Sequence, residues 1–398
     1  MRANMPNMNS LEKKSAIAIA FMIALRMYGL FLILPVFTVY AENIKGTTPA
    51  LTGIAIGVYG LTQALLQIPM GFLSDIWGRK KVIALGLLLF IMGSIIAALA
   101  TDIYWIIIGR LIQGMGAIAS TGMALVADVS RPEQRGKMMA IIGSSIGMAF
   151  MLAFITGPIL AAQIGLSGLF WFTAALAILA LLVLIFVVNE PTKLINRDYR
   201  FKELLHCIRQ KKLLLMDFGV FAIHASMTAL FLVLPLFLVH RFEIQLENHW
   251  KLYLPVLILS LSVMVPLVIK QEKKKQHFKL MGFAFLLCGM SLLLINWQHQ
   301  YFLLLGFYLV LYFGLFNFLE AAMPSTVSKI VDKKYRGAAM GAFSTSQFLG
   351  AFFGGVLGGY LYSQSEQLVL LVVALLLISV AGVGWVFTNK YEKNNSTL

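Results

Sequence analysis

The sequence predicts an all-α membrane protein whose twelve helices cross the bilayer in two six-helix halves of the same orientation. Three observations predict this fold. Of the 398 residues, 60% belong to the set AVILMFWYC, only 12% are charged, and one segment of the first half recurs in the second. Soluble proteins carry roughly 25% charged residues, so a water-soluble domain is not expected. A crossing helix needs about 20 apolar residues, so this composition can supply about twelve.

The apolar residues gather into stretches, most of them longer than the roughly 18 residues that indicate a membrane-crossing helix. Because backbone groups find no water partner in lipid, we expect helices and not open strands. The first stretch lacks the cleavage pattern of a signal peptide, so we expect it in the mature protein. The stretches are 15–40, 51–73, 80–99, 103–127, 137–161, 167–188, 213–239, 250–270, 278–297, 301–327, 337–362 and 367–388.

Basic residues are distributed unequally between the two sides of the membrane. Of the 32 Lys and Arg residues, 27 fall in alternate loops and near the two ends, whereas Lys45, Arg241 and Lys251 fall in the opposite loops. Positive loops remain cytoplasmic, so we expect both termini in the cytoplasm. The net charge of +15 therefore reflects topology. We expect anionic lipid headgroups, and not nucleic acid, as its partners.

The two halves share sequence. Residues 30–40 read LFLILPVFTVY and residues 230–240 read LFLVLPLFLVH, with seven of eleven positions identical. The pair Arg135-Gly136 likewise recurs as Arg336-Gly337. We predict an N-terminal six-helix bundle at 1–188, a cytoplasmic linker at 189–212 and a C-terminal six-helix bundle at 213–398. Parallel halves around a site at the membrane midplane are typical of one class of secondary transporter.

Several motifs resemble those of the major facilitator superfamily. The loop from Gly71 to Lys81 is similar to its cytoplasmic signature, except that Ile76 stands where an arginine is usual. The run from Arg110 to Gly116 resembles a signature of proton-coupled members, and Gly157-Pro158 resembles the antiporter signature of drug exporters.

Three further segments look most similar to YajR-type efflux transporters of the drug:proton antiporter family. They are 26–36, 317–321 and 344–350. The resemblance covers all twelve stretches and implies the major facilitator fold. It implies a proton-coupled antiporter in a bacterial inner membrane that exports hydrophobic or cationic drug-like compounds by alternating access. YajR-type transporters have a small cytosolic domain after the last helix, which we expect to be absent here.

One competing function is open at this stage. Arg26 and Arg110 would also suit a proton symporter that imports a small metabolite, such as a sugar or an organic anion. An enzyme is not expected, because the sequence has no metal-ligand set, nucleophile elbow or phosphate loop. We expect a monomer that binds a small-molecule substrate and protons and holds no metal or cofactor.

Charged residues at the cytoplasmic ends of the second, third and fourth stretches form a candidate cytoplasmic gate. An Asp–Arg–Asp cluster beside a helix N-terminus can hold one face shut through charge pairing and the helix dipole. The resemblance implies that this cluster latches the outward-facing state; the alternative is an ordinary basic loop. The candidate gate residues are Gly71, Asp75, Gly78, Arg79 and Asp128.

Small residues recur at helical spacing in the fifth and eleventh stretches. They let helix backbones approach and slide, or simply pack closely. Pro158 loosens the end of its helix. The candidate helix-seam residues are Gly143, Gly147, Gly157, Pro158, Gly350, Gly354 and Gly358.

Ionisable residues within predicted helices are costly in lipid and usually mark a transport pathway. A carboxyl group in a dry cavity can take up and release a proton near neutral pH, and histidine titrates there without help. The proton-coupling candidates are Glu320, His224, Arg110 and Asp217. A structural partner is the alternative for Glu320, helix packing for His224 and an interfacial position for Asp217. For Arg110, the alternative is to tie the fourth stretch to the first.

Other polar residues in the spans are candidates for the substrate cavity. Arg26 lies more than two turns inside the first stretch, so its charge cannot easily reach the water. It would bind substrate or respond to an acidic partner. The cavity candidates are Arg26, Gln63, Gln67, Gln113 and Asn317.

Overall fold

The computed structural model describes residues 10–131, 133–188, 210–274, 277–298, 301–332 and 335–395. The first half contains α1 (Ser10–Ile33), α2 (Phe37–Ala41), α3 (Pro49–Trp77), α4 (Arg79–Ala98), α5 (Ile103–Met115), α6 (Ala119–Val129) and α7 (Arg135–Phe186). The second half contains α9 (Lys211–His240), η1 (Leu246–Asn248), α10 (Trp250–Lys274), α11 (His277–Gln298), α12 (Phe302–Ile330), α13 (Arg336–Tyr362) and α14 (Glu366–Asn395). These ranges contain no strand.

The predicted fold class is confirmed. Span 1 consists of α1 and α2, span 4 of α5 and α6, and spans 5 and 6 are the two parts of α7. Within the described residues, ten helices are long and apolar enough to cross a membrane. That number counts α7 once and omits α13, whose many glycines dilute its apolar character. The predicted linker lies outside the described residues up to position 209.

Local sequence signals explain where the helices begin and end. Thr48 caps α3 by accepting a hydrogen bond from the backbone of Leu51 at 3.2 Å, and Pro49 occupies the first helical turn. Both residue types are favoured at these positions. At the turn between α3 and α4, Gly78 has φ 99°, and inside α7 Gly165 has φ 67°. Glycine adopts such angles without steric cost, so each of these turns is tight.

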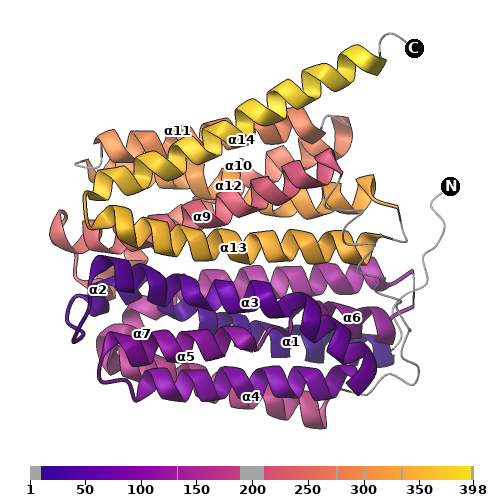
Figure 1. Ribbon diagram of the computed structural model, residues 1–398, viewed down its shortest axis with the longest axis horizontal. Coiled ribbons are helices and arrows are strands. Elements are labelled where there is room, and N and C mark those ends of the chain that lie inside the picture. Colours follow the sequence, from indigo (N-terminus) through magenta and orange to yellow (C-terminus); the bar gives the residue numbers. More distant parts are fainter. Residues whose placement is uncertain are drawn as a thin grey trace.

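Each half packs mainly on itself. In Figure 1 the first half, in indigo to magenta, lies below the second half, in orange to yellow. Inside the first half, α7 packs on α1 and α4, and α3 packs on α5; inside the second, α9 packs on α13, and α11 packs on α14. The repeated prolines differ, because Pro35 separates α1 from α2 whereas Pro235 lies inside the unbroken α9.

One end of the bundle carries the basic loops, and we call it the basic end. The start of α1 and the end of α14 lie there, on the right in Figure 1. Contacts between the halves gather toward the opposite, far end. There Thr38 donates to the carbonyl oxygen of Phe231 at 3.5 Å. Oε2 of Glu42 lies 3.3 Å from Nε2 of His240, and the ring centres of Phe154 and Phe231 are 4.7 Å apart.

Helices α3 and α13 form the main seam between the halves and run side by side through the centre of Figure 1. Glycines allow this approach. A Cβ on Gly57 would lie 2.7 Å from the carbonyl oxygen of Phe352, and one on Gly60 would lie 2.6 Å from that of Phe348. A Cβ on Gly355 would lie 2.6 Å from the carbonyl oxygen of Gly53. The two backbones therefore touch with no side chain between them.

The spans differ in how far the protein covers them. The apolar window of α9 is 94% buried, whereas that of the α10 span is 28% buried. Helix α9 is thus enclosed by protein, while α10 lies at the outside of the bundle. Since a polar side chain costs less away from lipid, α9 is a favourable place for titratable residues.

Candidate transport and gating site

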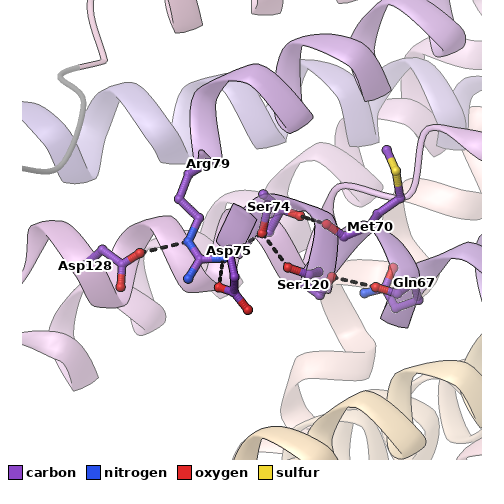
Figure 2. A network of polar contacts seen from close by, with 9 residues as sticks. Gln67, Met70, Ser74, Asp75, Arg79, Ser120 and Asp128 are labelled. Carbon is purple, nitrogen blue, oxygen red and sulfur yellow. Dashed lines mark hydrogen bonds and ion pairs between the residues drawn. The ribbon is translucent and has the colours of Figure 1, made fainter. Parts of the chain in front are cut away.

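Arg79 lies at the centre of a buried charge cluster at the basic end. Its Nε donates to Oδ2 of Asp128 at 2.8 Å, and its Nη1 pairs with Asp75 and donates to Oγ of Ser74 at 2.6 Å. The Arg79 side chain is 1% exposed. A buried charge is tolerated only when it is paired, and here two carboxylates face one guanidinium. Figure 2 shows these partners converging from α3, α4 and α6.

The backbone holds this cluster in place. Gly78, with its positive φ, begins α4 immediately after α3 and so brings Arg79 back over the end of α3. Ser120 donates from α6 to the carbonyl oxygen of Gln67 at 2.9 Å (Figure 2). At Gly71, an added Cβ would lie 3.2 Å from Oγ of Ser120. Ile76, where the family pattern has arginine, is 62% exposed, whereas Arg79 is buried.

The structure thus brings the five predicted gate residues together at one end of the first half. Their latching role stays a prediction. A second ion pair at this end joins α1 to the loop before α7, where Arg131 contacts both carboxylate oxygens of Glu12 at 2.8 Å.

Arg26 lies fully inside the first half, at 1% exposure. Span 4 breaks between Met115 and Ala119, and the carbonyl oxygen of Gly116 accepts a hydrogen bond from Nη2 of Arg26 at 2.7 Å. The same nitrogen donates to the Tyr59 hydroxyl at 3.0 Å. A helix C-terminus leaves carbonyl groups unpaired and carries partial negative charge. The guanidinium therefore stabilises this break both as a hydrogen-bond donor and as a positive charge.

Arg110 anchors a neighbouring network. Its Nη1 donates to Oε1 of Gln113 at 2.9 Å, and Nε2 of Gln113 donates to Oγ of Ser94 at 2.7 Å. Its Nε donates to the carbonyl oxygen of Ala55 at 3.4 Å, and its guanidinium lies 5.0 Å from the centre of the Tyr59 ring. This tie runs from span 4 to span 2, and not to span 1 as the structural alternative expected.

The glutamines assigned to the cavity are also buried in the first half. Gln63 accepts from Arg26 at 3.4 Å and donates to Gln67 at 3.5 Å, and both glutamine side chains are enclosed. In the second half, Asn317 donates to Oγ of Ser260 at 3.4 Å and so links α12 to α10. The cavity roles of these residues stay predictions.

The second half contains a titratable cluster made by three helices. Nε2 of His224 on α9 lies 3.6 Å from Oε2 of Glu320 on α12. Nε2 of Gln347 on α13 lies 2.8 Å from Nε2 of His224 and 3.2 Å from Oε1 of Glu320. The Glu320 side chain is 39% exposed, although its Oε2 atom is buried and has no hydrogen-bond partner. A proton can be shared within this group with little movement.

Asp217 lies seven residues before His224 on α9, so both side chains share one face of the helix. Asp217 is partly exposed and lies nearer the basic end. The structure does not bring it into contact with Glu320. An interfacial position and a place on a proton path both fit this location.

The predicted seam glycines have different surroundings. An added Cβ on Gly350 or Gly354 would meet the backbone of α9 at Phe221 or Ala225, so these glycines pack within one half. Gly358 also faces α9. Gly157 packs against the carbonyl oxygen of Leu32, next to Pro158. At Gly143 and Gly147, an added Cβ would meet nothing within 4 Å, so no helix approaches closely there.

Three functional features escaped the sequence reasoning. Gln347 lies in the segment 344–350 but was not among the amide side chains predicted to line the cavity. Tyr59, which contacts both buried arginines, resembles any aromatic residue in a span. Gly355 and Gly359, which form the seam between halves, could have been found from their spacing of four residues.

The described residues form an all-helical bundle of two halves with ten helices long and apolar enough to cross a membrane and a buried charge cluster at one end, which is the architecture of a polytopic membrane transporter. The chain belongs to the Major Facilitator Superfamily, whose family model matches residues 19–354 and 274–397.

Three comparisons place it among known proteins. It is 40% identical to the inner membrane transport protein YajR of Escherichia coli over 355 residues, which cover 88% of this chain and 78% of that protein. It is 24% identical to multidrug resistance protein 2 of Bacillus subtilis, with coverage of 92% and 93%. The crystal structure of a bacterial homologue of the human lysosomal transporter Spinster, inward-facing and occupied, matches with TM-score 0.81 at 13% identity, covering 97% of this chain and 99% of that one. This last likeness concerns the fold alone.

Proposed function

We propose that this transporter is a proton-coupled antiporter that exports hydrophobic or cationic drug-like compounds by alternating access. The observation that carries the proposal is the contact of His224, Gln347 and Glu320 between α9, α12 and α13. It offers a carboxylate that is partly exposed and only partly satisfied. A proton and a cationic substrate would compete for that carboxylate, and this competition gives exchange when the site changes its exposure only while one of the two is bound.

The placement of charge favours a cation over an anion. Arg26 and Arg110 are enclosed in the first half, and Arg26 supports the break in span 4 while Arg110 ties spans 2 and 4 together. Glu320, in contrast, is partly exposed. A substrate that reached the centre of the protein would therefore meet a carboxylate before it met a guanidinium.

Three features support alternating access. The bundles proposed at 1–188 and 213–398, joined by the linker 189–212, can move against each other. The α3–α13 seam has glycine on both sides, and the contacts between halves gather toward the far end. The Arg79 cluster lies at the basic end, where opening and closing would make and break contacts.

We further propose a bacterial inner membrane as the location, with the basic end and both termini facing the cytoplasm and the protein acting as a monomer. The supporting observations are the excess of Lys and Arg in alternate loops and the name of the Escherichia coli relative. The name of the Bacillus subtilis relative supports drug-like substrates.

The test is transport of the lipophilic cation ethidium by purified protein in proteoliposomes under an imposed pH gradient. We expect ethidium to accumulate on the acidic side, and Glu320→Gln to abolish this response. Glu272→Gln, which changes an exposed carboxylate paired with Lys329 at 2.9 Å, is the matched control and should transport normally. Movement of substrate in the same direction as the proton would instead establish symport. Unchanged transport by Glu320→Gln would exclude Glu320 as the proton site.

A further inference from the structure

Gln347 lies between the two titratable side chains of the second half. Its Nε2 atom is 2.8 Å from Nε2 of His224 and 3.2 Å from Oε1 of Glu320. An amide nitrogen carries two hydrogens, so both can be donated here, one to each neighbour. Gln347 comes from α13, whereas His224 comes from α9 and Glu320 from α12.

The histidine tautomer follows from its other ring nitrogen. Nδ1 of His224 lies 3.0 Å from the carbonyl oxygen of Val220, which can only accept a hydrogen bond, so Nδ1 carries a hydrogen. In the neutral ring, Nε2 then has one lone pair, and Gln347 donates to it. Oε2 of Glu320 lies 3.6 Å from the same nitrogen and accepts no hydrogen bond.

A proton held between His224 and Glu320 competes with that arrangement. If the proton binds Nε2 of His224, the nitrogen becomes a donor and repels the amide hydrogen of Gln347. If it binds Oε2 of Glu320 and is donated to His224, it takes the single lone pair that Gln347 used. In the first case the Gln347 amide must rotate and offer its oxygen to Nε2 of His224, and in the second case it must move away from that nitrogen. Only the proton moves between His224 and Glu320 in this step, and no other covalent bond forms or breaks.

Helix α13 connects this event to the seam between the halves. The next residue, Phe348, has its carbonyl oxygen against Gly60 of α3, and Gly355 packs against Gly53 further along. On its other side, α13 packs on the backbone of α9 through Gly350. A displacement of Gln347 therefore reaches the contact between the two halves within one residue.

On the basis of the proposed function, we propose that Gln347 is the positioning residue that converts protonation of the His224–Glu320 pair into movement of α13 against α3. On the helices that form the pair, Asp217 lies two turns from His224 on α9 and Tyr312 about two turns from Glu320 on α12, and Cys288 of α11 contacts the backbone of Tyr312. Tyr312 is occupied by Ser226 at 2.8 Å. Helices α13 and α14 carry their charged residues at their ends.

The test compares Gln347→Met, which keeps the length of the side chain without its hydrogen bonds, with the wild type. Binding of tetraphenylphosphonium is measured at about pH 6 and about pH 8, either side of the range in which histidine titrates. We expect the wild-type affinity to change about tenfold between them, as is common for coupled sites, and the variant to lose this change while still binding the cation. Gln347→Asn, which keeps the amide but shortens its reach, should lose only part of the change.

The controls separate this inference from the proposed function. Gln364→Met, at an exposed glutamine after α13, should behave as the wild type. If Glu320→Gln abolishes the pH response but Gln347→Met and Gln347→Asn both retain it in full, the role of Gln347 is overturned and the proposed function stands. If Glu320→Gln itself retains the response, the proposed function fails. Thermal unfolding of each variant checks that it is folded. If Gln347→Met does not fold, the inference is tested on Gln347→Asn.

Discussion

Arg26 donates a hydrogen bond across 2.7 Å to the backbone carbonyl oxygen of Gly116, at the place where span 4 stops being helical. The two residues are 90 positions apart, yet the side chain supplies what the broken helix lacks. This contact assigns Arg26 a structural task in the first half. It also makes the break itself a fixed feature of the fold.

Replacing Arg26 should therefore destabilise the protein before it affects transport. Arg26→Met removes the charged donor from the buried carbonyl group of Gly116, which keeps only the backbone N–H of Ile118 at 2.9 Å, and a hydrogen bond to a charged group contributes about 1.5–3 kcal/mol. Thermal unfolding in detergent measures the loss, and Lys251→Met, at an exposed lysine, should show little change. If Arg26→Met unfolded at the wild-type temperature but no longer transported, the side chain would serve the substrate, as the sequence predicted.

The Arg79 cluster should be sensitive to loss of either carboxylate. Asp128→Asn leaves Arg79 buried with Asp75 as its remaining anionic partner, and breaking a buried pair costs about 3–5 kcal/mol. Because Asp75 remains, we expect the lower end of that range, read from thermal unfolding. Glu133→Gln, at an exposed loop position, should shift stability by less than about 0.5 kcal/mol. Equal effects of the two substitutions would contradict the buried pairing.

The seam between the halves should not tolerate side chains. In Gly57→Ala the new methyl group would lie 2.7 Å from the carbonyl oxygen of Phe352, and such overpacking costs about 1–3 kcal/mol. We expect the far end to open more often, so that a cysteine introduced at the buried Thr38 is labelled roughly tenfold faster, since 1.4 kcal/mol is about tenfold. Gly136→Ala meets no atom within 4 Å and is the control. Unchanged labelling would show that the α3–α13 seam accommodates the new methyl group without opening the far end.

Gly143 and Gly147 should accept alanine in the conformation described here. An added Cβ meets nothing within 4 Å at either position, and alanine in a helix is about 0.5–1 kcal/mol more favourable than glycine. Each substitution should raise the unfolding temperature. Loss of transport despite that gain would support the predicted moving seam on span 5. Full transport by both variants would instead argue against it.

Much of the fold could be predicted because membrane crossing imposes a length on every helix. The spans followed from runs of about 20 apolar residues, and the halves followed from a repeated segment. The break in span 4 could not be predicted in the same way, since Gly114 and Gly116 also fit a continuous helix in which small residues allow close packing. Whether the helix is continuous or broken here depends on Arg26, a residue of α1 that contacts Gly116.

The candidate site was predicted unevenly. Asp75, Arg79 and Asp128 come together as their charges indicated, because a buried guanidinium needs partners. Arg110 was predicted to couple protons, with a tie to span 1 as the structural alternative, and its hydrogen bond goes to Ala55 on span 2. Sequence periodicity gives the face of a helix and not the identity of the neighbour. Gln347 was not among the amide side chains predicted to line the cavity, because its neighbours His224 and Glu320 come from two other helices that the sequence does not place beside it.

The enclosure of α9 affects what the surrounding lipid can touch. A photoreactive group attached to an acyl chain would mark α10 heavily and leave α9 almost unmarked, even though both cross the same bilayer. Helix α9 is therefore shielded from the membrane's composition and thickness. His224 is buried and can change its protonation without exposing charge to hydrocarbon, so different lipids should alter the speed of this transporter more readily than its chemistry.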